Sequence, residues 1–179
     1  MTATSAQRAE TDIIDMRTPR VLGAYGVTMV LALFGSSALL RTCAPPPAVT
    51  TLNVVSDCVS RTNNERTSRG LAALVVDARL NTAAAGHSTY QAQNNLMTHT
   101  GAGGTSPGTR MTKAGYVWRT WGENVAAGQP DCASVIGAWM NSAGHRANIL
   151  NPAFTNIGLA GVKSAKGTIY WTMDLAAPR

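Results

Sequence analysis

Twenty consecutive residues without a charge, 21–40, divide this chain into two parts. The run reads VLGAYGVTMVLALFGSSALL and is long enough to cross a bilayer as a helix. Arg17 and Arg20 stand just before it, which predicts that residues 1–20 stay in the cytoplasm. A buried core helix is the alternative. It is disfavoured because the run has no polar face that a helix of a small globular domain could expose to water. We therefore expect the rest of the chain to fold on the far side of the membrane.

The fate of this segment is open between two alternatives. Small residues at 36–38 suit cleavage by a signal peptidase, whereas the length of the apolar run favours an uncleaved anchor. In both cases a stiff, proline-rich linker at 41–50 separates the membrane segment from a folded domain at 51–179. Cys43 in that linker is expected to be a spare thiol or to be removed.

Composition is that of an ordinary globular protein with a mild positive charge. The chain is 45% hydrophobic and 6% aromatic, and its net charge is +6. Beyond the linker, eleven basic and six acidic side chains are scattered, and no basic helix with interleaved aromatic residues occurs. We expect a general attraction to an anionic envelope and no recognition of nucleic acid.

Two cysteines, Cys58 and Cys132, lie in the exported part. In an oxidising compartment such a pair is expected to join. Closing the long loop between them would stabilise the fold by about 4–5 kcal/mol in the chain-entropy model. Two separate buried thiols are the alternative.

Apolar residues at steps of three and four predict a first helix at 51–69 and a second that runs to about Met97. On the face of the first helix that carries these apolar residues, Asn63 and Arg66 are polar. The C-terminal end of that helix should therefore pack against another polar element. Two further helices begin at good capping residues, and they are predicted after Ser106 and over Asp131 to Asn141. The remainder is predicted to be β-structure, with a hairpin of strands at 157–162 and 168–175.

A series of short motifs runs in a specific order through 54–176. It comprises THTG at 98–101, SPGTRMTKAGY at 106–116, GENVAAG at 122–128, WMNSAGHRANIL at 139–150 and YWTMDLA at 170–176. In these motifs the domain resembles the CAP superfamily, or SCP domain, of cysteine-rich secretory proteins, and most closely its bacterial branch. The resemblance implies an α+β fold, a three-layer α-β-α sandwich. The elements predicted from the sequence, helices on either side of a small antiparallel sheet, agree with this fold.

In the better-known eukaryotic members of that family, a cleft holds two histidines and two acids, and in some it binds zinc or another divalent ion. Matched motif by motif, the resemblance implies that His99 and His145 are the histidines and Glu123 is the first acid. Asn148 completes the motif of the second histidine. Ser142 stands where the second acid lies in those members.

These residues admit a chemical and a structural interpretation. Two imidazoles and a carboxylate suit Zn²⁺ with a fourth position for water, which would make a metal-dependent hydrolase with His99 and His145 as ligands and Glu123 as base. In the structural interpretation Glu123 accepts hydrogen bonds where three loops meet. We expect binding or structure rather than catalysis, with Asn124 and Asn148 in the same cleft.

Other candidates are expected to be structural. His87 lies on a helical stripe and should be packed and hydrogen-bonded. Ser106 matches the G-x-S-x-G nucleophile elbow, but no buried strand precedes it and it is suited to cap a helix. The four tryptophans are expected to pack in the core or to line the cleft: Trp118, Trp121, Trp139 and Trp171. For one of them, a platform for stacking against a sugar is the alternative.

Together these features predict an exported protein, either anchored by its N-terminal helix or secreted. Its expected partner is a lipid, a cell-wall glycan or a protein of the cell envelope, bound in the cleft that holds the His-Glu-His cluster.

Overall fold

The computed structural model of the chain describes residues 14–15, 48 and 50–179. The membrane segment predicted at 21–40 lies outside the described residues, as does nearly all of 1–20 and of the linker. Within the part that is described, no helix is long and apolar enough to cross a membrane. Nearly every described residue belongs to the domain predicted at 51–179.

The middle layer is a six-stranded sheet in the order β1-β4-β6-β5-β2, with β3 also paired to β5. Its centre is an antiparallel trio in which β6 (Ile169–Pro178) lies between β4 (Trp118–Ala127) and β5 (Asn156–Lys163). The β5–β6 hairpin is the one predicted from the sequence. Three two-residue strands complete the sheet: β1 (Ile14–Asp15) beside β4, and β2 (Thr50–Thr51) and β3 (Val75–Val76) beside β5.

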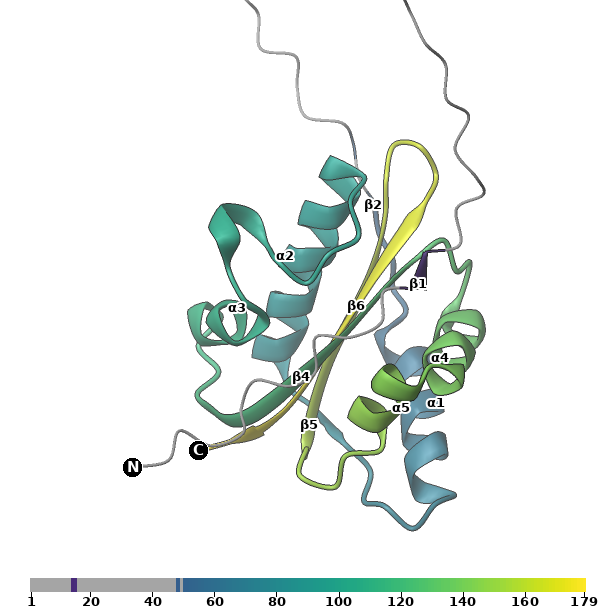
Figure 1. The fold of residues 1–179 in the computed structure, drawn as a ribbon, viewed down its shortest axis with the longest axis vertical. Coiled ribbons are helices and arrows are strands. Elements are labelled where there is room, and N and C mark those ends of the chain that lie inside the picture. The colour runs from purple at the N-terminus through teal and green to yellow at the C-terminus, as the bar shows by residue number, and fades with distance from the viewer. Residues whose placement is uncertain (1–13, 16–47, 49) are drawn as a thin grey trace, which may run out of the picture.

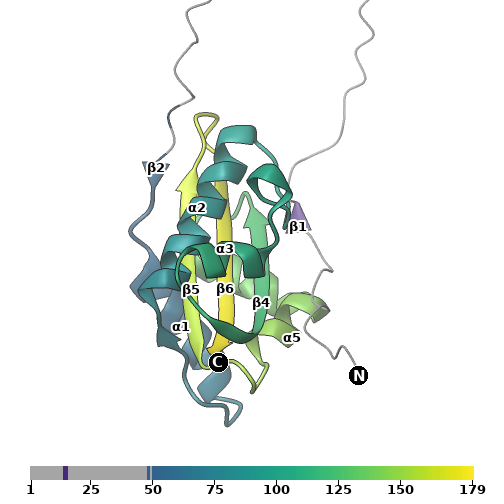
Figure 2. The same cartoon turned by 90° about the vertical axis from the view of Figure 1, so that its left-hand side faces the viewer.

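Helices cover both faces of this sheet (Figures 1 and 2). On one face lie α2 (Ala78–Asn94) and α3 (Pro107–Lys113). On the other lie α1 (Val55–Thr67), α4 (Cys132–Asn141) and α5 (Ala143–Ile149). The α+β fold with a helical layer on each side of the sheet is confirmed.

The helices begin where their capping residues predict. The side chain of Ser106 accepts a hydrogen bond from the Thr109 amide at the start of α3, and Asp131 accepts one from the Ser134 amide at 2.8 Å at the start of α4. At the end of α2, Asn95 adopts the left-handed conformation with a φ of 49°. That turn ends the helix three residues before the predicted Met97.

One glycine fixes how closely α2 approaches the sheet. A Cβ atom on Gly158 of β5 would lie 2.1 Å from the carbonyl carbon of Leu80. Only a residue without a side chain allows this contact of two backbones. The face of the sheet below α2 and α3 is therefore tightly closed at this point.

The three two-residue strands were not predicted, and the first helix begins at Val55 rather than at 51, where β2 lies. Two longer elements were also not predicted, and both are held by polar contacts from distant residues. β4 carries Glu123 and Asn124 in its buried part, so it lacks the apolar alternation of a strand. α5, at 143–149, was assigned to the β-structured remainder, and that prediction was wrong. Its seven residues include glycine and give too short a helical signal on their own.

Arg66 explains why α5 can end inside the protein. Its guanidinium is buried and donates hydrogen bonds to the backbone oxygens of Ile149 and Asn151, at 2.7 and 2.9 Å. It thereby satisfies carbonyl groups that a helix C-terminus leaves unpaired. The expectation that the polar end of the first helix docks on a polar element is confirmed.

The disulfide predicted between Cys58 and Cys132 is present, with the two Cα atoms 4.9 Å apart. It joins the first turn of α1 to the first residue of α4. The bridge lies in the same core cluster as Trp139 of α4 and Trp171 of β6, both fully buried. The bridge therefore holds together the two helices that cover this face of the sheet.

Removing the disulfide should destabilise the domain. A Cys58→Ala/Cys132→Ala variant should lose about 4 kcal/mol of unfolding free energy, because the unfolded chain regains the freedom of a 74-residue loop. Urea unfolding followed by tryptophan fluorescence measures the difference. A Cys43→Ser control should be as stable as the wild type, and a double variant that equals this control would contradict the prediction.

Candidate functional site

Glu123 forms the centre of a buried network on the α2–α3 face of the sheet. Its side chain is 1% exposed. One carboxylate oxygen, Oε1, lies 2.8 Å from Nδ1 of His99, and the other, Oε2, accepts a short hydrogen bond from Nη2 of Arg110. Both oxygens of the carboxylate are therefore engaged by side chains of the protein.

Arg110 comes from α3 and was not considered in the sequence analysis. Its Nη1 donates to the backbone oxygens of His99 and Thr105, at 2.9 Å each. One guanidinium thus connects α3, the loop that carries His99, and β4. The only signal in the sequence was an arginine among the small and polar residues of the SPGTRMT segment.

Burial alone would raise the pKa of Glu123. The hydrogen bond from His99 and the positive charge of Arg110 outweigh that effect and hold the pKa of Glu123 below its ordinary value. Glu123 is accordingly an anion at neutral pH whose charge is compensated inside the protein. It is poorly suited to act as a general base, because protonating it would break both of its contacts.

Asp174 is a second buried carboxyl group that the sequence did not reveal. It lies directly opposite Glu123 in the pairing of β4 with β6 and is 0% exposed. Neither of its oxygens accepts a hydrogen bond within the described part of the chain. Burial, reinforced by the negative charge of Glu123, raises the pKa of Asp174 well above its ordinary value. A neutral, protonated Asp174 fits this position.

His87 is packed and hydrogen-bonded, as expected. Its Nε2 lies 2.7 Å from the backbone oxygen of Thr98, and burial lowers the pKa of its imidazole. Nearby on α2, the hydroxyl of Ser88 donates to Thr172 of β6 at 2.8 Å. His87 and Ser88 thus join α2 to the loop before His99 and to β6, while Nδ1 of His87, Nε2 of His99 and both oxygens of Asp174 have no hydrogen-bond partner within the described residues.

His145 lies with α5 on the opposite face of the sheet. Asn124, the neighbour of Glu123 on β4, points to that face and donates to the backbone oxygen of His145 at 3.1 Å. Asn148 donates to Oδ1 of Asn124 at 2.9 Å. The Nδ1 atom of His145 lies 2.8 Å from the hydroxyl of Ser142, which stands in the place of the second acid.

The predicted site residues therefore form two groups on either side of β4. His99 and Glu123 contact each other directly, while Asn124, His145 and Asn148 fasten α5 to the strand. The amide of Asn148 also donates to the backbone oxygen of Glu123 at 3.3 Å, and this bond links the groups. Asn124 thus holds α5 against β4.

The contacts of Glu123 do not suit a zinc ion. Within the described residues, no group of three or more His, Cys, Asp and Glu side chains is placed to hold a metal. The guanidinium of Arg110 contacts the only carboxylate of the expected cluster, so a cation at this position would be repelled. The geometry of Glu123 favours the structural interpretation.

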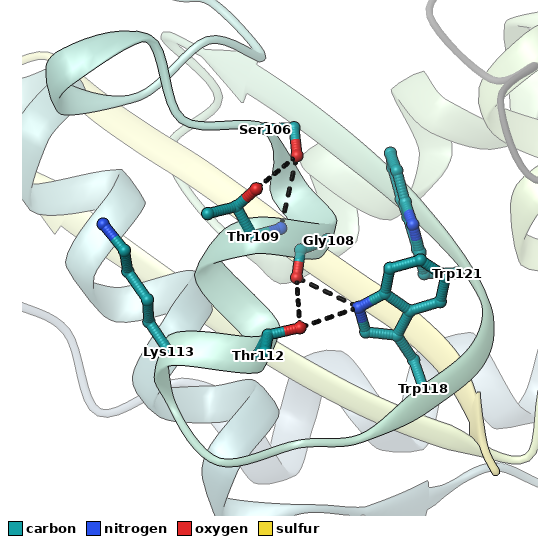
Figure 3. Close-up of a pocket in the computed structure, with 7 residues that line it drawn as sticks. All are labelled: Ser106, Gly108, Thr109, Thr112, Lys113, Trp118 and Trp121. Carbon is teal, nitrogen blue, oxygen red and sulfur yellow. Dashed lines mark hydrogen bonds between the residues drawn. The ribbon is translucent and has the colours of Figure 1, made fainter.

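An open groove lies on the outer side of α3, next to this network (Figure 3). Its volume is about 500 Å³, within the range of small-ligand sites. Trp118 and Trp121 of β4 form one side, and the residues of the α3 segment form the rest: Ser106, Gly108, Thr109, Thr112 and Lys113. Ser106 caps the helix here, which agrees with the rejection of a nucleophile elbow.

Removing one member of the Glu123–Arg110 pair should lower the free energy of unfolding more than removing both members together. Glu123→Gln should lower the unfolding free energy by about 3–5 kcal/mol, because Arg110 keeps a buried and unpaired charge. A Glu123→Gln/Arg110→Met double variant should lose less unfolding free energy than the sum of the losses in Glu123→Gln alone and Arg110→Met alone. Chemical unfolding measures all three.

The matched control for that cycle is the exposed pair of Glu65 near the end of α1 and Arg69 in the turn that follows it. Glu65→Gln should cost less than about 1 kcal/mol. Additive losses at Glu123 and Arg110 would show that the two side chains do not act as a buried pair.

Replacing Asp174 should change how stability depends on pH. The folded protein keeps the Asp174 proton at pH values where the unfolded chain releases it, because the pKa is raised in the folded state. Stability of the wild type should therefore fall as the pH rises above about 4, and Asp174→Asn should lack this fall. Urea unfolding across the pH range tests this, with the exposed Asp57→Asn as control. Parallel curves for wild type and Asp174→Asn would contradict the prediction.

The chain is similar to known proteins over most of the domain. The model of the cysteine-rich secretory protein family, CAP, matches residues 59–175. The uncharacterized protein YkwD of Bacillus subtilis is 43% identical over 116 residues, which cover 65% of this chain and 44% of YkwD. The uncharacterized membrane protein YlbC of the same species is 33% identical over 98 residues, covering 55% of this chain and 28% of YlbC. This chain thus spans less than half the length of either relative.

Solved structures share the fold. An extracellular protein containing an SCP domain from Bacillus anthracis is 28% identical, with a TM-score of 0.62 over 68% of this chain and 39% of that one. An outer surface protein of Borrelia burgdorferi, at 22% identity, shows the same fold with a TM-score of 0.67 over 74% of this chain and 100% of that one. With its motifs in order and its fold in agreement, the chain belongs to the cysteine-rich secretory protein (CAP) family.

Proposed function

We propose that this protein is an extracytoplasmic CAP domain that binds a component of the cell envelope and does not catalyse a reaction on it. The disulfide between Cys58 and Cys132 supports an oxidising compartment. The similarity to an extracellular SCP-domain protein of Bacillus anthracis and to a Bacillus subtilis membrane protein supports the same location.

The state of Glu123 is the observation that carries the choice of binding over catalysis. Its carboxylate is 1% exposed and held by His99 and Arg110, and these two contacts stabilise the ionised form, which makes Glu123 a weak base. A general base needs an open hydrogen-bond position toward its substrate. In this proposal His99, Glu123 and Asn124 hold the architecture.

The groove beside α3 is then the site offered to a ligand. It is open, it is lined by side chains of a helix and a strand, and its helix is fixed from behind by Arg110. Rigid elements of this kind reduce the entropy that binding costs. The net charge of +6 adds a general attraction to anionic envelope polymers.

In this proposal the uncharged run 21–40 keeps the protein at the membrane or directs its secretion. The proline-rich linker at 41–50 then separates the domain from the membrane surface. A binding module held in this way would reach the layer of polymers next to the membrane.

Cosedimentation with the cell envelope tests the proposal. The full-length protein, purified in detergent micelles, should sediment with detergent-insoluble envelope fragments in a saturable manner. A bound fraction should persist at 0.5 M salt (roughly a 4 Å screening length), because surface charge alone is screened there. The reduced and unfolded protein is the control. Loss of all binding at that salt concentration would contradict a specific site.

The metal-dependent hydrolase is the competing function, and zinc distinguishes the two. Titration of Zn²⁺ into the same protein should give no saturable heat, and His99→Ala or His145→Ala should leave this result unchanged. A saturable heat that either variant abolishes, together with release of soluble envelope fragments, would establish the hydrolase instead.

A further inference from the structure

The groove beside α3 carries a pair of tryptophans arranged as a corner. The ring centroids of Trp118 and Trp121 are 6.2 Å apart, and the ring planes meet at 77°. Both side chains are half-buried, and both line the groove (Figure 3). We propose that this corner binds a pyranose ring of an envelope glycan. The proposal rests on the function proposed above and names its ligand class.

Both indoles are fixed before a ligand arrives. Nε1 of Trp118 donates to the backbone oxygen of Gly108 at 3.0 Å and lies 3.1 Å from the hydroxyl of Thr112. Trp121 packs on the same glycine, since a Cβ atom there would lie 2.6 Å from its Nε1. Aromatic rings held in this way offer a large contact area at a low cost in conformational entropy.

The polar rim of the groove complements the apolar corner. Hydroxyl groups of Ser106, Thr109 and Thr112 lie between the indoles and Lys113 in the view of Figure 3. Within the described residues, no hydrogen bond uses Nε1–H of Trp121, whose edge packs on Gly108. A pyranose ring has an apolar C–H face for stacking and a rim of hydroxyl groups for hydrogen bonding. Both halves of the groove therefore find a matching surface on one sugar.

Other ligand classes fit less well. A planar base inserted between two rings needs a parallel slot, whereas the planes of Trp118 and Trp121 are nearly perpendicular. An acyl chain needs an apolar channel, whereas this groove is short, open and lined by three hydroxyl groups and an ammonium group. A sugar is the class that uses both kinds of surface.

The buried network explains how the corner keeps its shape. Arg110 lies on α3 between Thr109 and Lys113, and its guanidinium reaches inward to Glu123. The groove residues of the same helix face outward. Glu123 and Trp121 lie two residues apart on β4. The ion pair thus fixes the helix against the strand that carries both indoles.

Titration with a soluble oligosaccharide tests the proposal. The probe is the β-1,4-linked trimer of N-acetylglucosamine, alongside soluble glycan released from envelope fragments. With the full-length protein in micelles, tryptophan fluorescence and calorimetry should show saturable binding of at least one of them. Trp121→Ala should weaken it at least about tenfold, and Trp121→Phe should weaken it less, because a ring remains for stacking.

Glycine substitutions give a matched pair within helices. Gly108→Ala should also weaken binding at least about tenfold, because the added Cβ atom displaces Trp121. Gly86→Ala on α2 is the control, since a Cβ atom there meets nothing within 4 Å. Val117→Ala, an exposed apolar residue outside the groove, is a second control. Thermal unfolding confirms that each variant is folded.

Three results would overturn the assignment. Binding that survives Trp121→Ala and Gly108→Ala would place the sugar elsewhere. Envelope binding without binding of either soluble glycan would leave the proposed function standing and exclude a glycan. Mass spectrometry of an organic extract of the protein could detect a lipid that is absent from the Gly108→Ala variant. This result would show that the groove binds a lipid instead of a sugar. If the protein binds no envelope fraction at all, the proposed function fails as well.

Discussion

The buried carboxylate of Glu123 is the interaction on which the arrangement of the domain depends. A charge inside a protein is tolerated only when its partners compensate it, and here they come from the loop of His99 and from α3. The same guanidinium of Arg110 also holds two backbone carbonyls of that loop. One ion pair therefore decides where a loop and a helix lie on the sheet, and through the helix it shapes the outer groove.

The groove proposed as a binding site lies apart from the buried polar network. The network residues contact one another, on one face through Glu123 and on the other through Asn124 and Asn148. Other residues of the 106–116 motif line the open groove. The groove with Trp118 and Trp121 is open and has no part in that network's hydrogen bonds. The binding function proposed for this chain rests on that rigid scaffold and on its open aromatic corner.

Much of the fold could be predicted because its signals are local. Asp131 and Ser106 begin helices through contacts with amides three residues away, and such contacts depend only on the neighbouring sequence. β4 and α5 could not be predicted, because long-range contacts stabilise them. Arg66 supports the end of α5 from more than eighty residues away in the chain. The strand β4 is recognisable only once Asp174 and its neighbours in β6 lie beside it.

The sequence by itself determined the family, the starts of α3 and α4, the one cysteine pair of the domain, and His99, His145 and Glu123 as the motif side chains, since these depend on residue types and spacings. Only the tertiary structure decided what those side chains contact. A strand points successive residues to opposite faces, so Glu123 and Asn124, adjacent in the chain, serve different layers. The tertiary structure also decided that Arg110 neutralises Glu123, because charge compensation depends on distance in space and not on order along the chain.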